Sequence, residues 1–145
     1  KMQIIIRKAR PKDILTVYEQ ICKLENKLLI FNTFKNRFIN NIYNKNIIYL
    51  VAIAKSKEIV GFTSCHIQDL LHHNKKVAEI QELYVNQHFR NSGIGSSLIK
   101  ALKNKLNYRN CESLEVTAQN KRKITHKFYV KNGLSKTHIK FTSEL

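Results

Sequence analysis

The sequence predicts a mixed α/β (α+β) fold, in which helices cover both faces of a mostly antiparallel central sheet. Three observations predict it. Strand-like segments rich in Ile and Val alternate with amphipathic helical segments along the chain. Short polar turns join the middle strands, which is typical of antiparallel hairpins. One strand–helix–strand unit, residues 77–117, requires a parallel pair of strands joined by a right-handed crossover.

The first 45 residues predict one strand followed by two helices. Residues 3–7 are rich in Ile and form the expected first strand. Pro11 suits the first turn of a helix, because its missing N–H costs nothing there. Apolar residues at helical spacing then continue to Leu24. A second helix is expected over residues 33–43, where aromatic and aliphatic side chains share one face.

The middle of the chain predicts an antiparallel meander. Residues 47–54 and 58–67 are expected strands, and the polar residues 55–57 between them form a hairpin turn. A second turn at residues 72–74 leads into a third expected strand at 77–85. The three strands should therefore lie side by side in chain order.

The remaining residues predict a helix, a strand, a helix and a strand. Residues 93–106 form a strongly amphipathic helix, and residues 113–117 a short strand. The next helix, residues 123–132, is ended by Asn132 and Gly133, a common C-terminal signal. Residues 134–141 are expected to form the last strand.

Length and composition favour one globular domain, residues 1–145. The mass is 17.0 kDa and 43% of residues are hydrophobic, which is enough for a packed core. No apolar run approaches the roughly 20 residues that a membrane span needs, so no membrane partner is expected. Three widely spaced cysteines fit neither a disulfide framework nor a metal pattern. These features favour a reducing, cytoplasmic location.

The charge balance is strongly basic. Lys and Arg number 26 against 10 Asp and Glu, which gives a net charge of +16. Such a field attracts polyanions, whether nucleic acids or phosphorylated cofactors. The basic residues are spread along the chain with no arm or tail, and Lys, Asn and Ile are abundant together. We therefore interpret the excess mainly as compositional bias and do not expect a nucleic-acid partner.

A hexapeptide between an expected strand and an expected helix predicts an anion site. It runs from Arg90 to Gly95, with Gly93 and Gly95 as two of the four glycines in the chain. The first turn of a helix offers unpaired N–H groups and the positive end of the dipole, and glycine lets a phosphate approach the backbone. This arrangement suits a pyrophosphate. A dinucleotide fingerprint is excluded because Leu98 stands where its third glycine belongs, and no P-loop lysine follows.

Two segments resemble motifs of one enzyme superfamily. Residues 80–98 look like motif A of the GNAT acyl-CoA N-acyltransferases, and Asn120 with residues 126–134 looks like motif B. The expected order of elements is also similar to that fold along nearly the whole chain. The combination of His126, Phe128 and Tyr129 is similar to bacterial members that act on small amines, including aminoalkylphosphonate acetyltransferases. Gln87 departs from the usual proline, and Leu134 from the usual phenylalanine.

The resemblance implies acetyl-CoA as cosubstrate and no metal. The strand residues Leu83, Tyr84 and Val85 would pair with the pantetheine arm like an added strand. Asn120 would hydrogen-bond to the pantetheine. The pyrophosphate would be wrapped by the turn and the first helical residues, which are Arg90, Asn91, Ser92, Gly93, Ile94, Gly95 and Ser96.

The implied chemistry is direct attack of a primary amine on the thioester. Tyr129 would protonate the departing thiolate, since a phenol carries its proton at neutral pH. Glu82 and Glu79 are both candidates for the base, and we favour Glu82. Strand alternation puts these two carboxylates on opposite faces unless a bulge intervenes. Alternatively, the glutamates are solvated strand residues and Tyr129 is a packing aromatic.

The sequence therefore predicts an acetyl-CoA-dependent N-acetyltransferase for a small-molecule amine. A homodimer is also possible, because paired protomers are common in the family. The alternative is a basic nucleic-acid or protein-binding module that keeps the fold without turnover. Salt-sensitive DNA binding without affinity for acetyl-CoA would favour that alternative.

Overall fold

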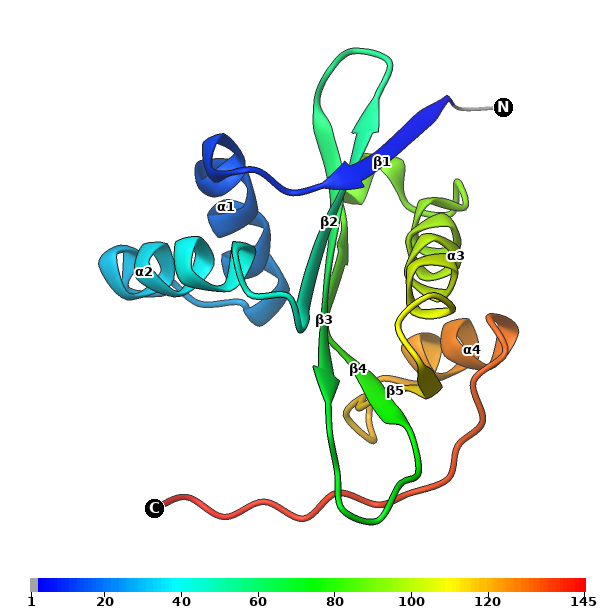
Figure 1. Cartoon of the computed structure of the whole chain (residues 1–145). Helices are drawn as coiled ribbons and strands as arrows, with labels where there is room; N and C mark the ends of the chain where they lie inside the picture. Colours follow the sequence, from blue (N-terminus) through cyan, green and yellow to red (C-terminus); the bar gives the residue numbers. More distant parts are fainter. Residues whose placement is uncertain (1–2) are drawn as a thin grey trace.

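A computed structural model describes residues 3–145 and contains five strands and four α-helices within that range (Figure 1). Two 3-10 turns, Pro11–Asp13 and Gln87–Phe89, precede α1 and α3. The strands are β1 (Ile4–Lys8), β2 (Ile47–Ala54), β3 (Ile59–Gln68), β4 (Lys76–Val85) and β5 (Cys111–Val116). The α-helices are α1 (Ile14–Glu25), α2 (Phe31–Ile42), α3 (Ile94–Leu106) and α4 (Lys123–Lys131).

The strands form one sheet in the order β1-β2-β3-β4-β5. All neighbouring pairs are antiparallel except β4 and β5, which are parallel and joined through α3. Helices α1 and α2 lie on one side of the sheet, and α3 and α4 on the other (Figure 1). The predicted fold class is therefore confirmed.

Each face of the sheet has its own hydrophobic core. On the α3 side, Leu98 and Leu102 pack with Leu50 of β2, and all three are fully buried. On the α1 and α2 side, Phe38 packs with Val51, the next residue of β2. Neighbouring residues of one strand thus serve opposite cores, as the period of two requires. Phe34, Phe38, Tyr49 and Phe62 form a chain of ring contacts in the second core.

A buried ion pair ties β1 to the turn before α1. Asp13 is only 5% exposed, and its carboxylate accepts hydrogen bonds from Arg7 Nη1 at 2.8 Å and Nη2 at 3.1 Å. The Arg10 amide donates to the same carboxylate at 2.7 Å. Burial acts to raise the pKa of Asp13, but these hydrogen bonds outweigh it, so the pKa lies below its usual 3.8.

Asp13→Asn is expected to destabilise the fold by about 3 kcal/mol at neutral pH, because Arg7 would lose its partner in a partly buried place. A depressed folded pKa gives stability that is complete above the unfolded pKa and is lost as the pH falls through the folded value. The difference in the free energy of unfolding between wild type and variant, measured with urea, should therefore become smaller below about pH 3.8. A gap that stays constant down to about pH 2 would contradict this contribution.

The predicted last strand is wrong. Residues 134–141 are in no strand, and every residue from 135 to 145 is exposed. Gly133 has φ +88° at the end of α4, and the chain then leaves the body, so these residues have no neighbouring strand to pair with (Figure 1). The other predicted elements exist with ends that differ by two residues at most, except that residues 11–13 form a 3-10 turn before α1. Among residues 3–145, no helix is long and apolar enough to cross a membrane.

Candidate active site

The turn between β4 and α3 presents a row of unpaired backbone N–H groups. Asn91 and Gly93 both have positive φ, at 61° and 88°, which curls the backbone before the helix begins. The first helical hydrogen bond runs from the Ser97 N–H to the Gly93 carbonyl at 3.0 Å. Within the described part of the chain, the N–H groups of residues 90–96 have no partner. Consecutive free amides in such a curl form an anion cradle at the positive end of α3.

Arg90 adds a fixed positive charge to this cradle. Its Nε donates to the Val85 carbonyl at 2.9 Å, and its guanidinium carbon lies 5.6 Å from the centroid of the Tyr84 ring. The Ser92 hydroxyl donates to the Phe89 carbonyl and closes the turn. No acidic residue occurs between Val85 and residue 106 in the sequence, so this segment carries no negative charge of its own. The predicted residues Arg90 to Ser96 therefore gather in one electropositive turn.

Glycine is required at positions 93 and 95 of the turn for two different structural reasons. A Cβ at Gly93 would meet no atom within 4 Å, so the space beside this backbone is open. A Cβ at Gly95 would lie 2.9 Å from Cζ of Phe128, so glycine lets α4 pack against the first turn of α3. That packing holds the helix carrying Tyr129 next to the anion cradle.

A β-bulge in β4 determines which faces of the sheet carry Glu79 and Glu82. Ser64 pairs with Glu82 and Cys65 with Ile80, so Gln81 is an extra residue in β4. Before it, Ala78 and Ile80 belong to the core on the α3 side; after it, Leu83 and Val85 pack against the same core. The bulge therefore places Glu79 and Glu82 on the same face of the sheet, the one opposite α3.

The edge of β4 beyond the bulge has no neighbour on the β5 side. Parallel pairing of β4 with β5 ends at Ile80 and Val116. The described strands thus leave residues 81–85 of β4, including Leu83, Tyr84 and Val85, unpaired along one edge. An extended molecule could add to this edge as a strand does.

Glu82 is held firmly by buried polar residues of β3. The Ser64 hydroxyl donates to the Glu82 carboxylate and accepts from the Glu82 N–H at 3.0 Å. Thr63 Oγ1 donates to the Glu82 carbonyl at 2.9 Å, and both β3 residues are fully buried. Sequence reasoning missed Thr63 and Ser64. Their signal is two consecutive polar residues within an otherwise apolar strand.

Tyr49 of β2 is a second residue that sequence reasoning missed. Its hydroxyl accepts a hydrogen bond from Asn41 Nδ2 at 2.8 Å. Burial raises the pKa of Tyr49, and the negative charge of Glu82 raises it further, against a lowering by Asn41. Tyr49 thus connects the Glu82 site with the aromatic core under α2.

Glu79 is held more loosely than Glu82. Its carboxylate accepts one long hydrogen bond, from Thr117 Oγ1 at 3.4 Å. It stands opposite His66 in the sheet. Of the two candidate bases, Glu82 is therefore the better oriented.

Tyr129 is half-buried on α4 and packs against the α3 core with its ring 5.3 Å from that of Phe128. Burial raises the pKa of Tyr129 above the usual 10.0, and Arg122 lowers it by less. The phenol therefore carries its proton at neutral pH. Asn120 is exposed in the turn before α4, where its side chain has no hydrogen bond within the described residues.

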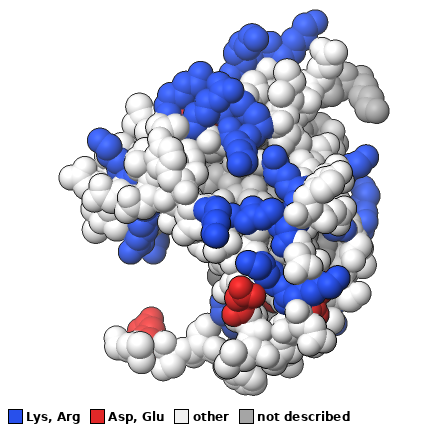
Figure 2. All heavy atoms as spheres, in the orientation of Figure 1, with Lys and Arg blue, Asp and Glu red and all other residues white. Residues whose placement is uncertain are grey.

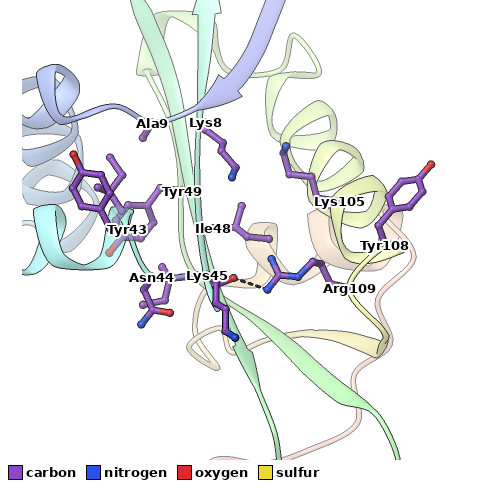
Figure 3. A pocket seen from close by; sticks show the side chains of 12 residues that line it. Lys8, Ala9, Tyr43, Asn44, Lys45, Ile48, Tyr49, Lys105, Tyr108 and Arg109 are labelled. Atoms are coloured by element: carbon purple, nitrogen blue, oxygen red, sulfur yellow. Dashed lines mark hydrogen bonds between the residues drawn. The ribbon is translucent and has the colours of Figure 1, made fainter.

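A separate basic hollow lies at the opposite edge of the sheet (Figure 3). It has a volume of about 430 Å³ and lies beside Ile48 and the C-terminal end of α3. Lys8, Lys45, Lys105 and Arg109 line it, and Lys and Arg gather around a central depression on this face (Figure 2). It contains no predicted site residue. The length of α3, about 20 Å, separates it from the anion cradle.

The fold and this turn define an N-acyltransferase that binds an acyl-CoA. The chain belongs to the GNAT acetyltransferase family, whose model matches residues 15–134. It is an N-acetyltransferase that uses acetyl-CoA as its acetyl donor. This assignment favours the predicted enzyme over the alternative of a binding module without turnover.

One relative is similar along nearly its whole length. The aminoalkylphosphonate N-acetyltransferase of Salmonella typhimurium is 34% identical over 140 residues, which cover 97% of this chain and 90% of that protein. The aminoglycoside N-acetyltransferase AAC(6')-Iy, solved with CoA, shares the fold with a TM-score of 0.89 and 15% identity, over 100% of this chain and 96% of that one. A transcriptional regulator from Bacillus halodurans shares the fold with a TM-score of 0.89 and 20% identity, over 99% of this chain and 100% of that one.

The residues present fit the CoA part of the donor. A diphosphate needs several convergent N–H donors and open space beside the backbone, and the turn at residues 90–96 offers both. Among residues 3–145, no group of three or more His, Cys, Asp or Glu is placed to hold a metal ion.

Proposed function

We propose that this chain transfers the acetyl group of acetyl-CoA to the primary amine of a small anionic molecule of the aminoalkylphosphonate type. The observation that carries the proposal is the bulge at Gln81, which brings Glu79 and Glu82 to one face beside the unpaired edge of β4. The 34% identical relative, named for aminoalkylphosphonates, supports this class of acceptor. The net charge of +16 favours an anionic one.

The donor contacts follow from the turn and the open strand edge. Acetyl-CoA supplies the acetyl group as a thioester. The free N–H groups of residues 90–96 and the Arg90 guanidinium hold the diphosphate. Leu83, Tyr84 and Val85 pair with the pantetheine along β4, and Asn120 donates to it from the turn before α4. A backbone N–H of this β4 segment also stabilises negative charge on the thioester oxygen during attack.

Glu82 acts as the base in this proposal. An alkylammonium has a pKa near 10, so it must lose a proton before it can attack. Ser64 holds one carboxylate oxygen of Glu82 in place, which leaves the other free to accept that proton through a water. Glu79 on the same face is the alternative base.

Tyr129 acts as the acid. The sulfur of the leaving group needs a proton, and the raised pKa of Tyr129 keeps its phenol protonated at neutral pH. Contact of Phe128 with Gly95 keeps α4 against the donor-binding turn, so the phenol is supplied from a fixed helix.

A thiol-release assay across a panel of amines tests the proposal. The panel contains an aminoalkylphosphonate, a polyamine, an aminoglycoside and a peptide amine, and the highest kcat/KM is expected for the aminoalkylphosphonate. Glu82→Gln should lower that kcat/KM by about 10²-fold or more, whereas the matched variant Glu79→Gln should lower it by less than about tenfold. Preference for an uncharged or cationic amine would contradict the acceptor class. The reverse order of the two variants would move the base to Glu79.

A further inference from the structure

The basic hollow at the far edge of the sheet exists because β1 does not extend to the start of β2. The last residue of β1, Lys8, pairs with Leu50, and among the described strands residues 47 and 48 of β2 pair only with β3. The C-terminal ends of α2 and α3 lie on either side of this gap. They leave the hollow of about 430 Å³, with Ile48 at its back (Figure 3).

Four cationic side chains line the hollow without a carboxylate among them. Lys8 comes from β1 and Lys45 from the turn before β2. Lys105 and Arg109 come from the last turn of α3 and the loop after it. None of the ten Asp and Glu residues of the chain lines the hollow, and within residues 3–145 none of the four cations forms an ion pair. Lys8, Lys105 and Arg109 extend toward the same space in front of β2 (Figure 3).

Neutralisation of the two helix ends does not account for four cations. The C-terminal ends of α2 and α3 each carry the equivalent of about half a negative charge, so together they offset about one of the positive charges. Three carbonyls in the last turn of α3 already accept hydrogen bonds, at 3.0 to 3.2 Å, from the backbone N–H groups of residues 107–109. A surplus of about three positive charges therefore faces the hollow.

The guanidinium of Arg109 is held in place at the hollow. Its Nη2 donates to the Lys45 carbonyl, so α3 is tied to the turn before β2 (Figure 3). The remaining N–H groups of a fixed guanidinium suit phosphate oxygens, and lysine ammonium groups add charge around them. Several adjacent phosphates would match the surplus of positive charge.

The size of the hollow favours a compact ligand over a nucleic-acid strand. Its volume lies within the range of about 300–1,000 Å³ that is usual for small-molecule sites. A single-stranded nucleic acid needs a basic groove with aromatic rings on which successive bases stack. Tyr108 is 90% exposed, but its ring is turned away from the hollow (Figure 3).

We propose that the basic hollow binds a small molecule that carries two or more adjacent phosphate groups, and that it does so while acetyl-CoA occupies the anion cradle. The phosphates lie among Lys8, Lys105 and Arg109, and an apolar part of the ligand lies against Ile48. The length of α3, about 20 Å, separates the two sites, so the diphosphate of one CoA cannot fill both. This binding does not depend on which amine is acetylated or on which glutamate is the base.

Calorimetric titration of the full chain with inorganic tripolyphosphate tests this site. The titration is done without divalent cations and with saturating CoA, so that the anion cradle is filled. One equivalent is expected to bind per chain, and the Kd should rise with salt, because ions screen exposed charges. Absence of binding under these conditions, or displacement of bound tripolyphosphate by CoA, would overturn the proposal.

A pair of double variants places the bound tripolyphosphate. Lys8→Gln with Lys105→Gln should raise its Kd by about tenfold or more, because two of the four charges are removed. The matched control, Lys23→Gln with Lys100→Gln, lowers the net charge equally at exposed positions of α1 and α3 outside the hollow. It should change the Kd by less than about threefold. All four lysines are exposed, so both variants should keep the wild-type fold. Equal effects of the two variants would assign the binding to net charge and overturn the proposal.

Two further ligands separate a small molecule from a nucleic acid. A nucleoside triphosphate that binds at least as tightly as tripolyphosphate would support a small ligand with its apolar part on Ile48. A single-stranded RNA of about ten nucleotides should bind more weakly than tripolyphosphate at the same salt concentration. Tighter binding of this RNA that is lost in the hollow variant and kept in the control would overturn the small-molecule assignment.

Discussion

Tyr129→Phe is expected to lower kcat by about 10²–10³-fold while the KM for acetyl-CoA changes by less than about threefold. The variant keeps the ring that packs against the α3 core and removes only the hydroxyl, so the fold and the donor-binding turn are preserved. What is lost is the proton donor, which acts when the thiolate departs. Steady-state kinetics with the preferred amine measure both constants.

The matched control for this prediction is Tyr108→Phe, which removes a phenol from an exposed loop residue after α3. It should leave both constants unchanged. Equal losses in kcat and in donor affinity for Tyr129→Phe would assign Tyr129 to binding or packing instead. The alkaline limb that Tyr129 gives to the pH profile of kcat should lie above pH 10 and disappear in the variant, because burial raises its pKa.

The anion cradle could be predicted from sequence because its determinants are local. A strand, two glycines and an amphipathic helix occur within consecutive residues, and the positive φ of Gly93 needs only glycine at that position. The bulge in β4 could not be predicted in the same way. Gln81 and Glu82 are consecutive polar residues, and in the structure Glu82 pairs with Ser64 of β3 while Gln81 is the bulged residue. The position of Glu79 and Glu82 on one face therefore depends on how β4 pairs with β3, which the local sequence of β4 does not determine.

Residues 134–141 show the opposite case, in which a strand-like local pattern predicted an element that the structure lacks. Alternation of Thr137, Ile139 and Phe141 favours a strand, but a strand exists only when its backbone groups have a partner. The exit direction of the chain at Gly133 removes that partner.

Gly93→Val is expected to abolish acetyl-CoA binding. Gly93 has φ +88°, a conformation that a β-branched residue adopts only at a cost of about 1–3 kcal/mol. A Cβ there meets no atom, so the loss comes from backbone conformation and not from a clash. Relaxation of φ would rotate the amides on either side and disperse the donors that hold the diphosphate.

Thermal unfolding with and without acetyl-CoA measures this effect. At 100 times its Kd, the donor stabilises a native state that binds it by about 2.7 kcal/mol, and the variant should show none of this increment. Gly133→Val is the control, because Gly133 has the same φ of +88° at the end of α4, and a Cβ there would meet only the flexible end of Lys103 at 3.3 Å. This control variant should destabilise the apoprotein by a similar amount and should still be stabilised fully by acetyl-CoA. An increment retained in Gly93→Val would mean that the diphosphate binds elsewhere, since no other feature of the turn at residues 90–96 depends as strongly on one backbone angle.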